Sequence, residues 1–253
     1  MRKILSVIFT LYAFTIFIVL MFVLFPFVII ASFFGRVSGG NMIYNICRFW
    51  ADIFMLLTAI NHTNVFEAPK ATGHPAVFVF NHISYMDIPV LMKAFRKQPI
   101  RILAKAEMAK VPVFGFFYRQ ATIMVERGNL QARAKSVRQL KSILKKNISI
   151  VLAPEGTFNM THHPLKEFYD GAFKVAIETQ TPVQPVVFLD AYDRLGYESI
   201  FSLTPGKSRA VFLEEIAVNK FTLQDTKILK ELVYRKMEEA LIKYNASWIK
   251  NKE

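Results

Sequence analysis

The sequence has a single cysteine, Cys47, among its 253 residues. One thiol cannot form an internal disulfide, which is typical of a catalytic domain that faces a reducing compartment. Acidic side chains are also few, 19 against 32 lysines and arginines, so the formal net charge is +13. That excess of positive charge indicates a polyanionic partner: a nucleic acid, an anionic membrane surface or a phosphorylated substrate.

The signatures of several other enzyme classes are missing. There is no G-x-S-x-G turn to carry a serine nucleophile. Residues 205–208 (Pro-Gly-Lys-Ser) resemble part of a phosphate-binding loop, but Phe201 occupies the position of the glycine that such a loop requires. His162 and His163 are adjacent, yet no third ligand follows at a spacing that suits a metal. We therefore expect neither a metal site nor a cofactor.

Charge is absent from one long stretch, residues 4–35, with Arg2 and Lys3 before it and Arg36 after it. As a helix this stretch would be roughly 45 Å long, more than the apolar core of a bilayer requires. It is too long for the apolar region of a cleaved signal peptide, and no small-x-small cleavage site follows it. A nucleic-acid-binding protein would not usually open with such a run. We therefore expect membrane lipids, and no nucleic acid, as the partner.

A second apolar stretch covers residues 42–60 and contains Arg48 and Asp52. Its apolar residues recur at helical spacing, which suits a helix at the membrane interface or one packed on the first helix. We predict a two-helix membrane anchor over residues 1–62, followed by a catalytic domain over residues 63–253.

From about residue 70, short apolar runs alternate with helical stretches. Such alternation is typical of a largely parallel sheet covered on both faces. The expected fold class is therefore α/β, with a largely parallel sheet flanked by helices and an N-terminal two-helix membrane anchor. The expected strands are 76–80, 100–104, 121–125, 149–153, 183–188 and 210–213, and the expected helices lie near 86–97, 107–118, 129–146 and 170–180. A last helix is expected from Thr222, where Asp225 forms a capping-box-like start, to about Tyr244.

Ligands of such sheets gather at the C-terminal ends of strands, so the residues after each strand are the first candidates for a site. The run 76–80 is followed by Asn81 and His82, and Asp87 comes five residues after the histidine. A carboxylate so placed can fix the imidazole tautomer and stabilise the imidazolium formed when a hydroxyl is deprotonated. The same Asn-His-x4-acid pattern recurs from residue 61, after the second anchor helix and not after a strand. We interpret its histidine, His62, as an ordinary interface residue.

Two later strand ends also carry polar residues. Arg127 follows the strand expected at 121–125, and Glu155, Gly156 and Thr157 follow the strand expected at 149–153. The arginine would provide a fixed cation for a phosphate, and the turn would provide backbone N–H donors.

Taken in order, these motifs resemble the lysophospholipid acyltransferase superfamily, whose bacterial members include 1-acylglycerol-3-phosphate acyltransferases. The first family block, Asn-His-x4-Asp, is matched at residues 81–87, and the arginine of the second block is retained as Arg127. The third block usually reads Phe-Pro-Glu-Gly-Thr-Arg-Ser, and residues 153–159 read Ala-Pro-Glu-Gly-Thr-Phe-Asn. The proline-centred strand of the fourth block is matched at 183–186, and Lys105 lies in a segment similar to the one between the first two blocks.

The resemblance implies transfer of an acyl chain from acyl-CoA or acyl-carrier protein to the free hydroxyl of a lysolipid, in the first place 1-acylglycerol-3-phosphate, giving phosphatidate. His82 is then the general base and Asp87 orients it. No covalent acyl-enzyme is needed, because a thioester is already activated. The catalytic domain is expected on the cytoplasmic face of the inner membrane. The residues expected to bind the acceptor are Asn81, Arg127, Glu155, Gly156, Thr157 and Lys105.

Phe158 is the main departure from the family pattern, because it replaces the usual arginine. Loss of a bidentate cation predicts weaker phosphate binding. The acceptor is therefore either lysophosphatidate, held by Arg127 with help from Lys105, or a lyso-amino-acid lipid of the ornithine or glycine type. A membrane-anchored lipid hydrolase is a third alternative, but we find no strand-end nucleophile for it. A non-catalytic basic membrane adaptor would explain the charge but not the order of the motifs.

Overall fold

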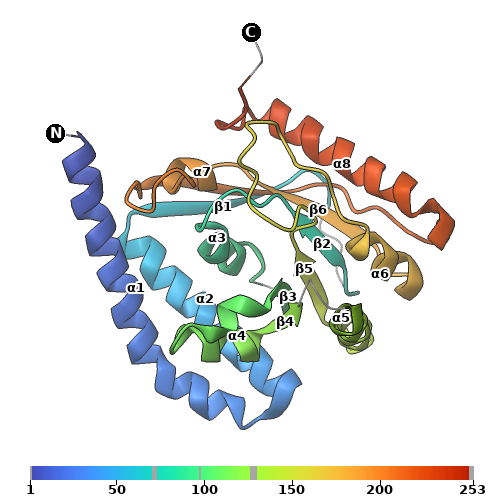
Figure 1. Cartoon of the computed structure of the whole chain (residues 1–253), viewed down its shortest axis with the longest axis horizontal. Coiled ribbons are helices and arrows are strands. Elements are labelled where there is room, and N and C mark those ends of the chain that lie inside the picture. Colours follow the sequence, from blue (N-terminus) through green and yellow to red (C-terminus); the bar gives the residue numbers. More distant parts are fainter. Residues whose placement is uncertain (1, 70–72, 97, 126–129, 251–253) are drawn as a thin grey trace.

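A seven-stranded, largely parallel sheet forms the centre of the molecule. The computed structural model describes residues 2–69, 73–96, 98–125 and 130–250 (Figure 1). The strands are β1 (Ile60–Phe66), β2 (Val77–Phe80), β3 (Ile100–Lys105), β4 (Thr122–Val125), β5 (Ser149–Leu152), β6 (Val183–Phe188) and β7 (Gly206–Phe212). They lie in the order β1-β7-β6-β2-β5-β3-β4, and every neighbouring pair is parallel except β6 and β7. The predicted α/β class with a largely parallel sheet is confirmed.

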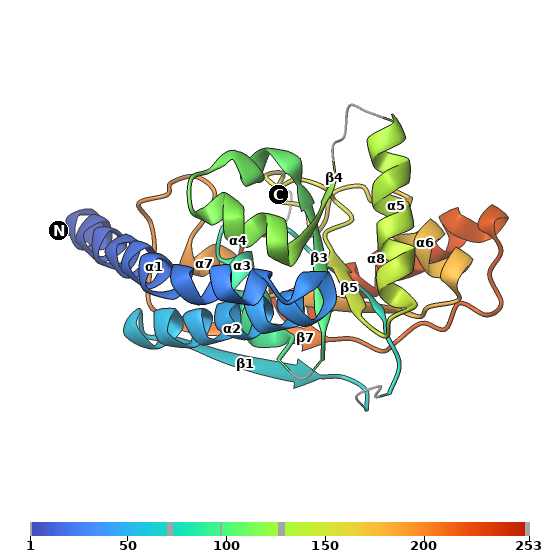
Figure 2. The ribbon, with the colours of Figure 1, turned by 90° about the horizontal axis from the view of Figure 1, so that it is seen from below.

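Helices cover both faces of this sheet (Figure 1). The longer helices are α1 (Arg2–Ser32), α2 (Gly40–Leu57), α3 (Asp87–Ala94), α4 (Phe114–Ala121), α5 (Leu130–Leu144), α6 (Gly171–Thr179) and α8 (Thr226–Lys243). Short helical segments are η1 (Gly35–Gly39), η2 (Ala106–Lys110), α7 (Ala191–Arg194) and η3 (Leu223–Asp225). Helices α2, α3 and α4 lie on one face, and α5, α6 and α8 lie on the other (Figures 1 and 2).

The three central strands β2, β5 and β6 are buried at every position. Apart from Ser149, Gln184 and Pro185, their residues are valine, isoleucine, leucine and phenylalanine, which favour a strand that is covered on both faces. Because all three run in the same direction, their C-terminal ends meet at one edge of the sheet. The first and third family blocks, which follow β2 and β5, are therefore brought to neighbouring positions at that edge.

Helix α1 lies along the outer side of α2 (Figures 1 and 2). Among the described residues, it is the one helix that is long and apolar enough to cross a membrane, with a mean hydropathy of 3.0 over Ile4–Ser32. Only 17% of its apolar window is buried within the protein. Large side chains on its outer side are exposed, among them Phe14, Phe22, Phe27 and Ile30. Such a contiguous apolar surface marks contact with lipid or another partner.

Helix α2 is bound to the sheet domain by polar side chains. Tyr44 is 1% exposed and donates a hydrogen bond to the carbonyl of Ala121 at 2.9 Å. Arg48 donates to the carbonyls of Phe95 and Gln98, each at 2.7 Å. These contacts leave α2 packed between α1 and the sheet domain, so the structure does not confirm the second helix of the predicted anchor as a lipid-embedded one.

Strand β1 was absent from the predicted set, and it contains His62. It pairs in parallel with β7, with Ile60 opposite Gly206 and Phe66 opposite Phe212. His62 does come after the second helix, as expected, but the polar run Ile-Asn-His-Thr-Asn-Val-Phe, for which no strand was predicted, forms the edge strand of the sheet. An edge strand can carry polar side chains on its exposed positions, so its sequence lacks the apolar run of a central strand. The predicted domain division between residues 62 and 63 falls inside β1.

Two predictions about helices have different outcomes. The single helix expected near 107–118 is wrong: η2 ends at Lys110 and α4 begins at Phe114. Pro112 lies between them and has no N–H to continue a helix. The start predicted at Thr222 is confirmed, because Thr222 and Asp225 form a capping box before α8.

Candidate active site

The turn that carries His82 is held to the end of the sheet by Asn81, the residue directly after β2. The side-chain amide of Asn81 donates to the carbonyl of Phe188 at 3.1 Å, and its oxygen accepts from the N–H of Phe188 at 2.7 Å. Asn81 is 1% exposed. The Asn81 side chain thus makes the hydrogen bonds that a backbone amide would make if β2 continued to pair with β6 beyond Phe80. Asn81 was expected to bind the acceptor, but both polar atoms of its amide group are engaged with Phe188.

His82 and Asp87, interpreted from the sequence as a base and the residue that orients it, are in contact. His82 Nδ1 lies 2.7 Å from Asp87 Oδ2, and the same oxygen accepts from the N–H groups of Ile83 and Ser84 at 3.0 and 3.1 Å. Asp87 is 2% exposed and is the first residue of α3, where the helix dipole favours a carboxylate. The His82 side chain is 28% exposed. With Nδ1–H donated to Asp87, the lone pair on Nε2 is available to take a proton.

Glu155 holds the backbone of the His82 turn. Its Oε1 accepts from the N–H of His82 at 2.8 Å, and its Oε2 accepts from the N–H of Lys166 at 2.9 Å. The N–H of Asn159 in turn donates to the carbonyl of His82 at 2.7 Å. Burial raises the pKa of Glu155 from its ordinary value of 4.5 to about 7, against the lowering effect of the two backbone hydrogen bonds, and the Asp87 charge adds to the rise.

The turn after β5 places the next two predicted residues. Gly156 has φ +72°, a left-handed conformation that glycine adopts without strain, and its N–H donates to the carbonyl of Ala153 at 3.1 Å. Thr157 is half-buried, and its Oγ1 accepts a hydrogen bond from Lys166 Nζ at 2.7 Å. Lys166 belongs to no family block, so no pattern in the sequence pointed to it.

Lys105, a further predicted residue, lies toward the other end of this edge. Lys105 is the last residue of β3 and is exposed, and its carbonyl accepts a hydrogen bond from the Tyr118 hydroxyl at 2.8 Å. Its backbone neighbour across the sheet is Val125, the last residue of β4. Arg127 lies outside the described residues.

Phe158, which replaces the family's arginine, contacts the predicted base. Its ring centroid lies 4.4 Å from that of His82 with an interplanar angle of 70°, and 4.9 Å from that of Tyr85 at 89°. Both contacts are edge-to-face arrangements, which stabilise aromatic pairs beyond the burial of area. Phe158 and Tyr85 therefore give the imidazole an apolar wall where the family pattern has a cation.

The second Asn-His-x4-acid pattern does not form such a pair. His62 Nδ1 lies 3.0 Å from the hydroxyl of Ser208, and its Nε2 lies 2.9 Å from Asn64 Oδ1. Burial lowers the pKa of His62. Glu67, the acid at the matching spacing, instead pairs with Lys243 at 2.7 Å. The same Asn-His-x4-acid spacing thus leads to different contacts at the two histidines. The His62 segment is an extended strand, whereas the His82 segment turns and brings Asp87 back to the imidazole.

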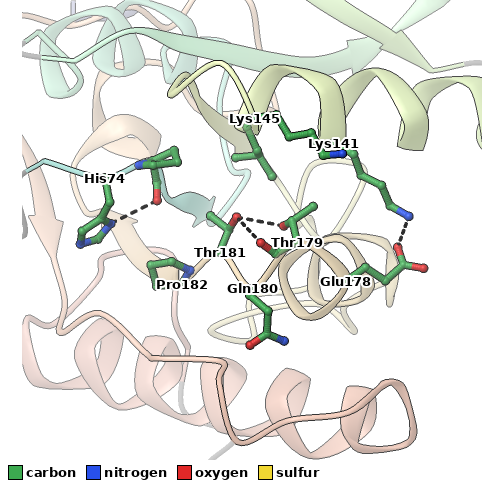
Figure 3. A pocket seen from close by; sticks show the side chains of 10 residues that line it. His74, Lys141, Lys145, Glu178, Thr179, Gln180, Thr181 and Pro182 are labelled. Carbon is green, nitrogen blue, oxygen red and sulfur yellow. Dashed lines mark hydrogen bonds and ion pairs between the residues drawn. The ribbon is translucent and has the colours of Figure 1, made fainter.

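A cavity of about 560 Å³ lies near the opposite edge of the sheet, before the first residues of β2 and β6 (Figure 3). It contains none of the predicted site residues. Figure 3 shows the ion pair between Lys141 and Glu178 at 2.7 Å on one side of it. Its lining is His74, Pro75, Lys141, Leu144, Lys145, Glu178, Thr179, Gln180, Thr181 and Pro182. Among the described residues, no group of three histidine, cysteine or acidic side chains is placed to hold a metal ion.

Comparison with known proteins identifies relatives. A 1-acyl-sn-glycerol-3-phosphate acyltransferase from Cocos nucifera is 28% identical over 156 residues, which is 61% of this chain and 48% of that protein. A lyso-ornithine lipid O-acyltransferase from Pseudomonas aeruginosa is 32% identical over 121 residues, 47% of this chain and 44% of that protein. The matched region thus spans about half the length of these two relatives.

A solved structure has the same fold. The crystal structure of the 1-acyl-sn-glycerophosphate acyltransferase PlsC from Thermotoga maritima superposes with a TM-score of 0.77 at 23% sequence identity. The superposition covers 99% of this chain and 100% of the other. The sequence model of the family described as Acyltransferase matches residues 56–189, which extend from the end of α2 to the end of β6 and include both His82 and Glu155. The chain therefore belongs to the Acyltransferase family.

Proposed function

We propose that this protein transfers an acyl chain from an acyl thioester to the free hydroxyl of 1-acylglycerol-3-phosphate and so forms phosphatidate. The observation that carries the proposal is the contact of His82 Nδ1 with Asp87 Oδ2 at 2.7 Å in a chain of the Acyltransferase family. A histidine held in this way by a carboxylate can act as a general base through its second nitrogen. The names of several relatives support the same acceptor.

The reaction needs one proton carrier. His82 Nε2 takes the proton of the acceptor hydroxyl as its oxygen attacks the thioester carbonyl carbon. The tetrahedral intermediate then expels the thiolate, which takes the proton from the imidazolium, so the histidine returns to its neutral form. Asp87 stabilises the imidazolium while it exists. No enzyme nucleophile takes part, because the thioester carbonyl is reactive enough for direct attack.

The donor in this proposal is acyl-CoA or acyl-carrier protein, and the acceptor is a lysolipid in the membrane. Arg127 and Lys105 bind the acceptor phosphate, with the Glu155-Gly156-Thr157 turn beside it. Lys105 supports this assignment by its place at the end of β3, on the edge to which β2 and β5 bring His82 and Glu155.

Lyso-ornithine lipid is a second candidate acceptor, and a specific observation favours it. Phe158 presents an aromatic ring to His82 where the family pattern has an arginine. A relative that acts on lyso-ornithine lipid by name shares 32% identity over 121 residues. A headgroup without phosphate requires less cationic charge beside the base, so the ring at residue 158 suits it.

We place α1 in the membrane and the sheet domain at the cytoplasmic face of the inner membrane. The exposed apolar side of α1 supports this arrangement, and the single free cysteine agrees with a reducing compartment. Within the predicted anchor over residues 1–62, α1 enters the lipid, while α2 is tied to the catalytic domain by Tyr44 and Arg48.

The test is acyl transfer by the purified full chain in detergent. Lysophosphatidate and lyso-ornithine lipid are offered separately, each with acyl-CoA and with acyl-carrier protein, and the products are identified by mass spectrometry. Phosphatidate formation by the unsubstituted protein and its loss in His82→Ala support the proposal. Strong preference for lyso-ornithine lipid would replace the acceptor, and unchanged transfer by His82→Ala would refute the base.

A further inference from the structure

The third family block of this chain has a cation near it that the block itself does not contain. Phe158 occupies the position of the family's arginine and is engaged with the rings of His82 and Tyr85. Lys166, eight positions further along, directs its ammonium group to the neighbouring residue, with Nζ 2.7 Å from Thr157 Oγ1. The positive charge that residue 158 lacks is thus provided by the Lys166 ammonium group, which lies at the side chain of the neighbouring residue Thr157.

The backbone contacts that place His82 also place this lysine. One oxygen of Glu155 accepts from the N–H of His82 at 2.8 Å, and the other accepts from the N–H of Lys166 at 2.9 Å. The carboxylate therefore connects the two residues through their main chains, independently of their side chains. Because Glu155 is 2% exposed, this connection is shielded from water and well defined.

Thr157 lies between two residues that contact His82. On one side Glu155 holds the His82 backbone, and on the other the Phe158 ring packs on the His82 imidazole. The threonine hydroxyl accepts from the Lys166 ammonium, so its own hydrogen is available for donation. The ammonium has further N–H donors, and none of the ion pairs within the described part of the chain includes Lys166.

We propose that Lys166 and Thr157 together bind the phosphate of the acceptor and that Lys166 replaces the arginine absent at residue 158. A phosphate oxygen accepts one hydrogen bond from Lys166 Nζ and one from Thr157 Oγ1. This inference rests on the proposed function, since it assigns residues to the acceptor of that same reaction. It also reconciles Phe158 with a phosphorylated acceptor: the ring shapes the environment of the base, and the lysine provides the charge.

The experiment compares two acceptors that differ only in the phosphate, lysophosphatidate and the corresponding monoacylglycerol. Lys166→Met removes the charge and retains an unbranched stem, and the backbone hydrogen bond to Glu155 does not depend on the side chain. We expect the KM for lysophosphatidate to rise by about ten- to a hundredfold in Lys166→Met, with kcat changed by less than about threefold. The kcat/KM for monoacylglycerol should be unchanged, and Lys166→Arg should restore a KM close to that of the unsubstituted protein.

The matched control is Lys227→Met, which removes an exposed lysine from α8 and should leave both acceptors unaffected. Thr157→Val, which removes the hydroxyl but keeps the shape, should raise the KM for lysophosphatidate alone. An unchanged KM in Lys166→Met, or an equal loss toward both acceptors, overturns the assignment. If the unsubstituted protein does not acylate lysophosphatidate, the proposed function fails; if it does and Lys166→Met does so equally well, only the role of Lys166 fails.

Discussion

The carboxylate of Glu155 accepts a hydrogen bond from the backbone N–H of His82 at 2.8 Å, and this bond joins the first and third family blocks. Glu155 thereby holds the main chain of His82, while Asp87 contacts the imidazole ring of His82. His82 is therefore held from two sides by two buried carboxylates.

Glu155→Gln should flatten the dependence of stability on pH. The folded-state pKa of Glu155 is about 7, above the ordinary 4.5, so the folded protein retains a proton that the unfolded chain releases. This contribution to stability is fully present below about pH 4.5 and is lost as pH rises to about 7, a change of about 3 kcal/mol. Glutamine has no such loss. Urea unfolding of both proteins between these pH values checks the prediction, and parallel curves would contradict it.

The same substitution should also lower activity. A glutamine has one carbonyl oxygen, so it can accept from the N–H of His82 or of Lys166 but not from both. The N–H left facing the amide NH₂ is buried and unpaired, and the His82 turn loses its placement. We expect kcat to fall by about tenfold or more. Single-turnover rates at pH 8 measure this, and Glu167→Gln, at an exposed neighbouring residue, is the control.

Phe158→Arg should shift the choice of acceptor. The new guanidinium adds positive charge beside the base, so kcat/KM for lysophosphatidate relative to lyso-ornithine lipid should rise by about tenfold. The kcat should fall for both acceptors, since His82 loses the ring that packs against it. Phe158→Leu separates the two effects, because it removes the ring without adding charge and should leave the ratio unchanged. An unaltered ratio in Phe158→Arg would remove residue 158 from the acceptor site.

Asn81→Ala should destabilise the protein by about 2–4 kcal/mol, because it leaves the N–H and the carbonyl of Phe188 without partners in a buried position. Asn81→Asp should not rescue it, since a carboxylate would face the Phe188 carbonyl. Denaturant unfolding followed by circular dichroism measures the loss. Asn219→Ala, at an exposed position, should lie within about 0.5 kcal/mol of the unsubstituted protein. A comparably small effect of Asn81→Ala would show that the side-chain pairing adds little to the sheet.

Much of the fold was predictable from the sequence because it depends on local signals. The apolar runs of β2, β5 and β6 predict buried parallel strands, since such strands need no polar face. The capping box before α8 is a contact within four residues and is readable for the same reason. The approach of Asp87 to His82 also lies within one short turn, so the spacing indicated it correctly.

Other features were decided by tertiary structure alone. Strand β1 is recognisable as a strand only through β7, whose pairing residues lie 146 positions further along the chain. The position of Lys166 depends on a loop that brings it back to Glu155 and Thr157, and no local sequence pattern predicts these contacts. The contact of Phe158 with His82 likewise joins residues from different strand ends.

The amino-acid sequence by itself therefore determined the parallel sheet, the long apolar first helix and the contact of His82 with Asp87. These features depend on the periodicity of apolar residues, the length of an apolar run and the spacing of two residues in one turn, all of which are properties of residues close together in the sequence. Tertiary structure alone decided what surrounds His82: the Glu155 carboxylate bonded to its backbone, the Phe158 ring against its imidazole, and Lys166 beside the turn after β5. Packing brings these groups together from distant positions, so the environment of His82 became visible only in the folded molecule.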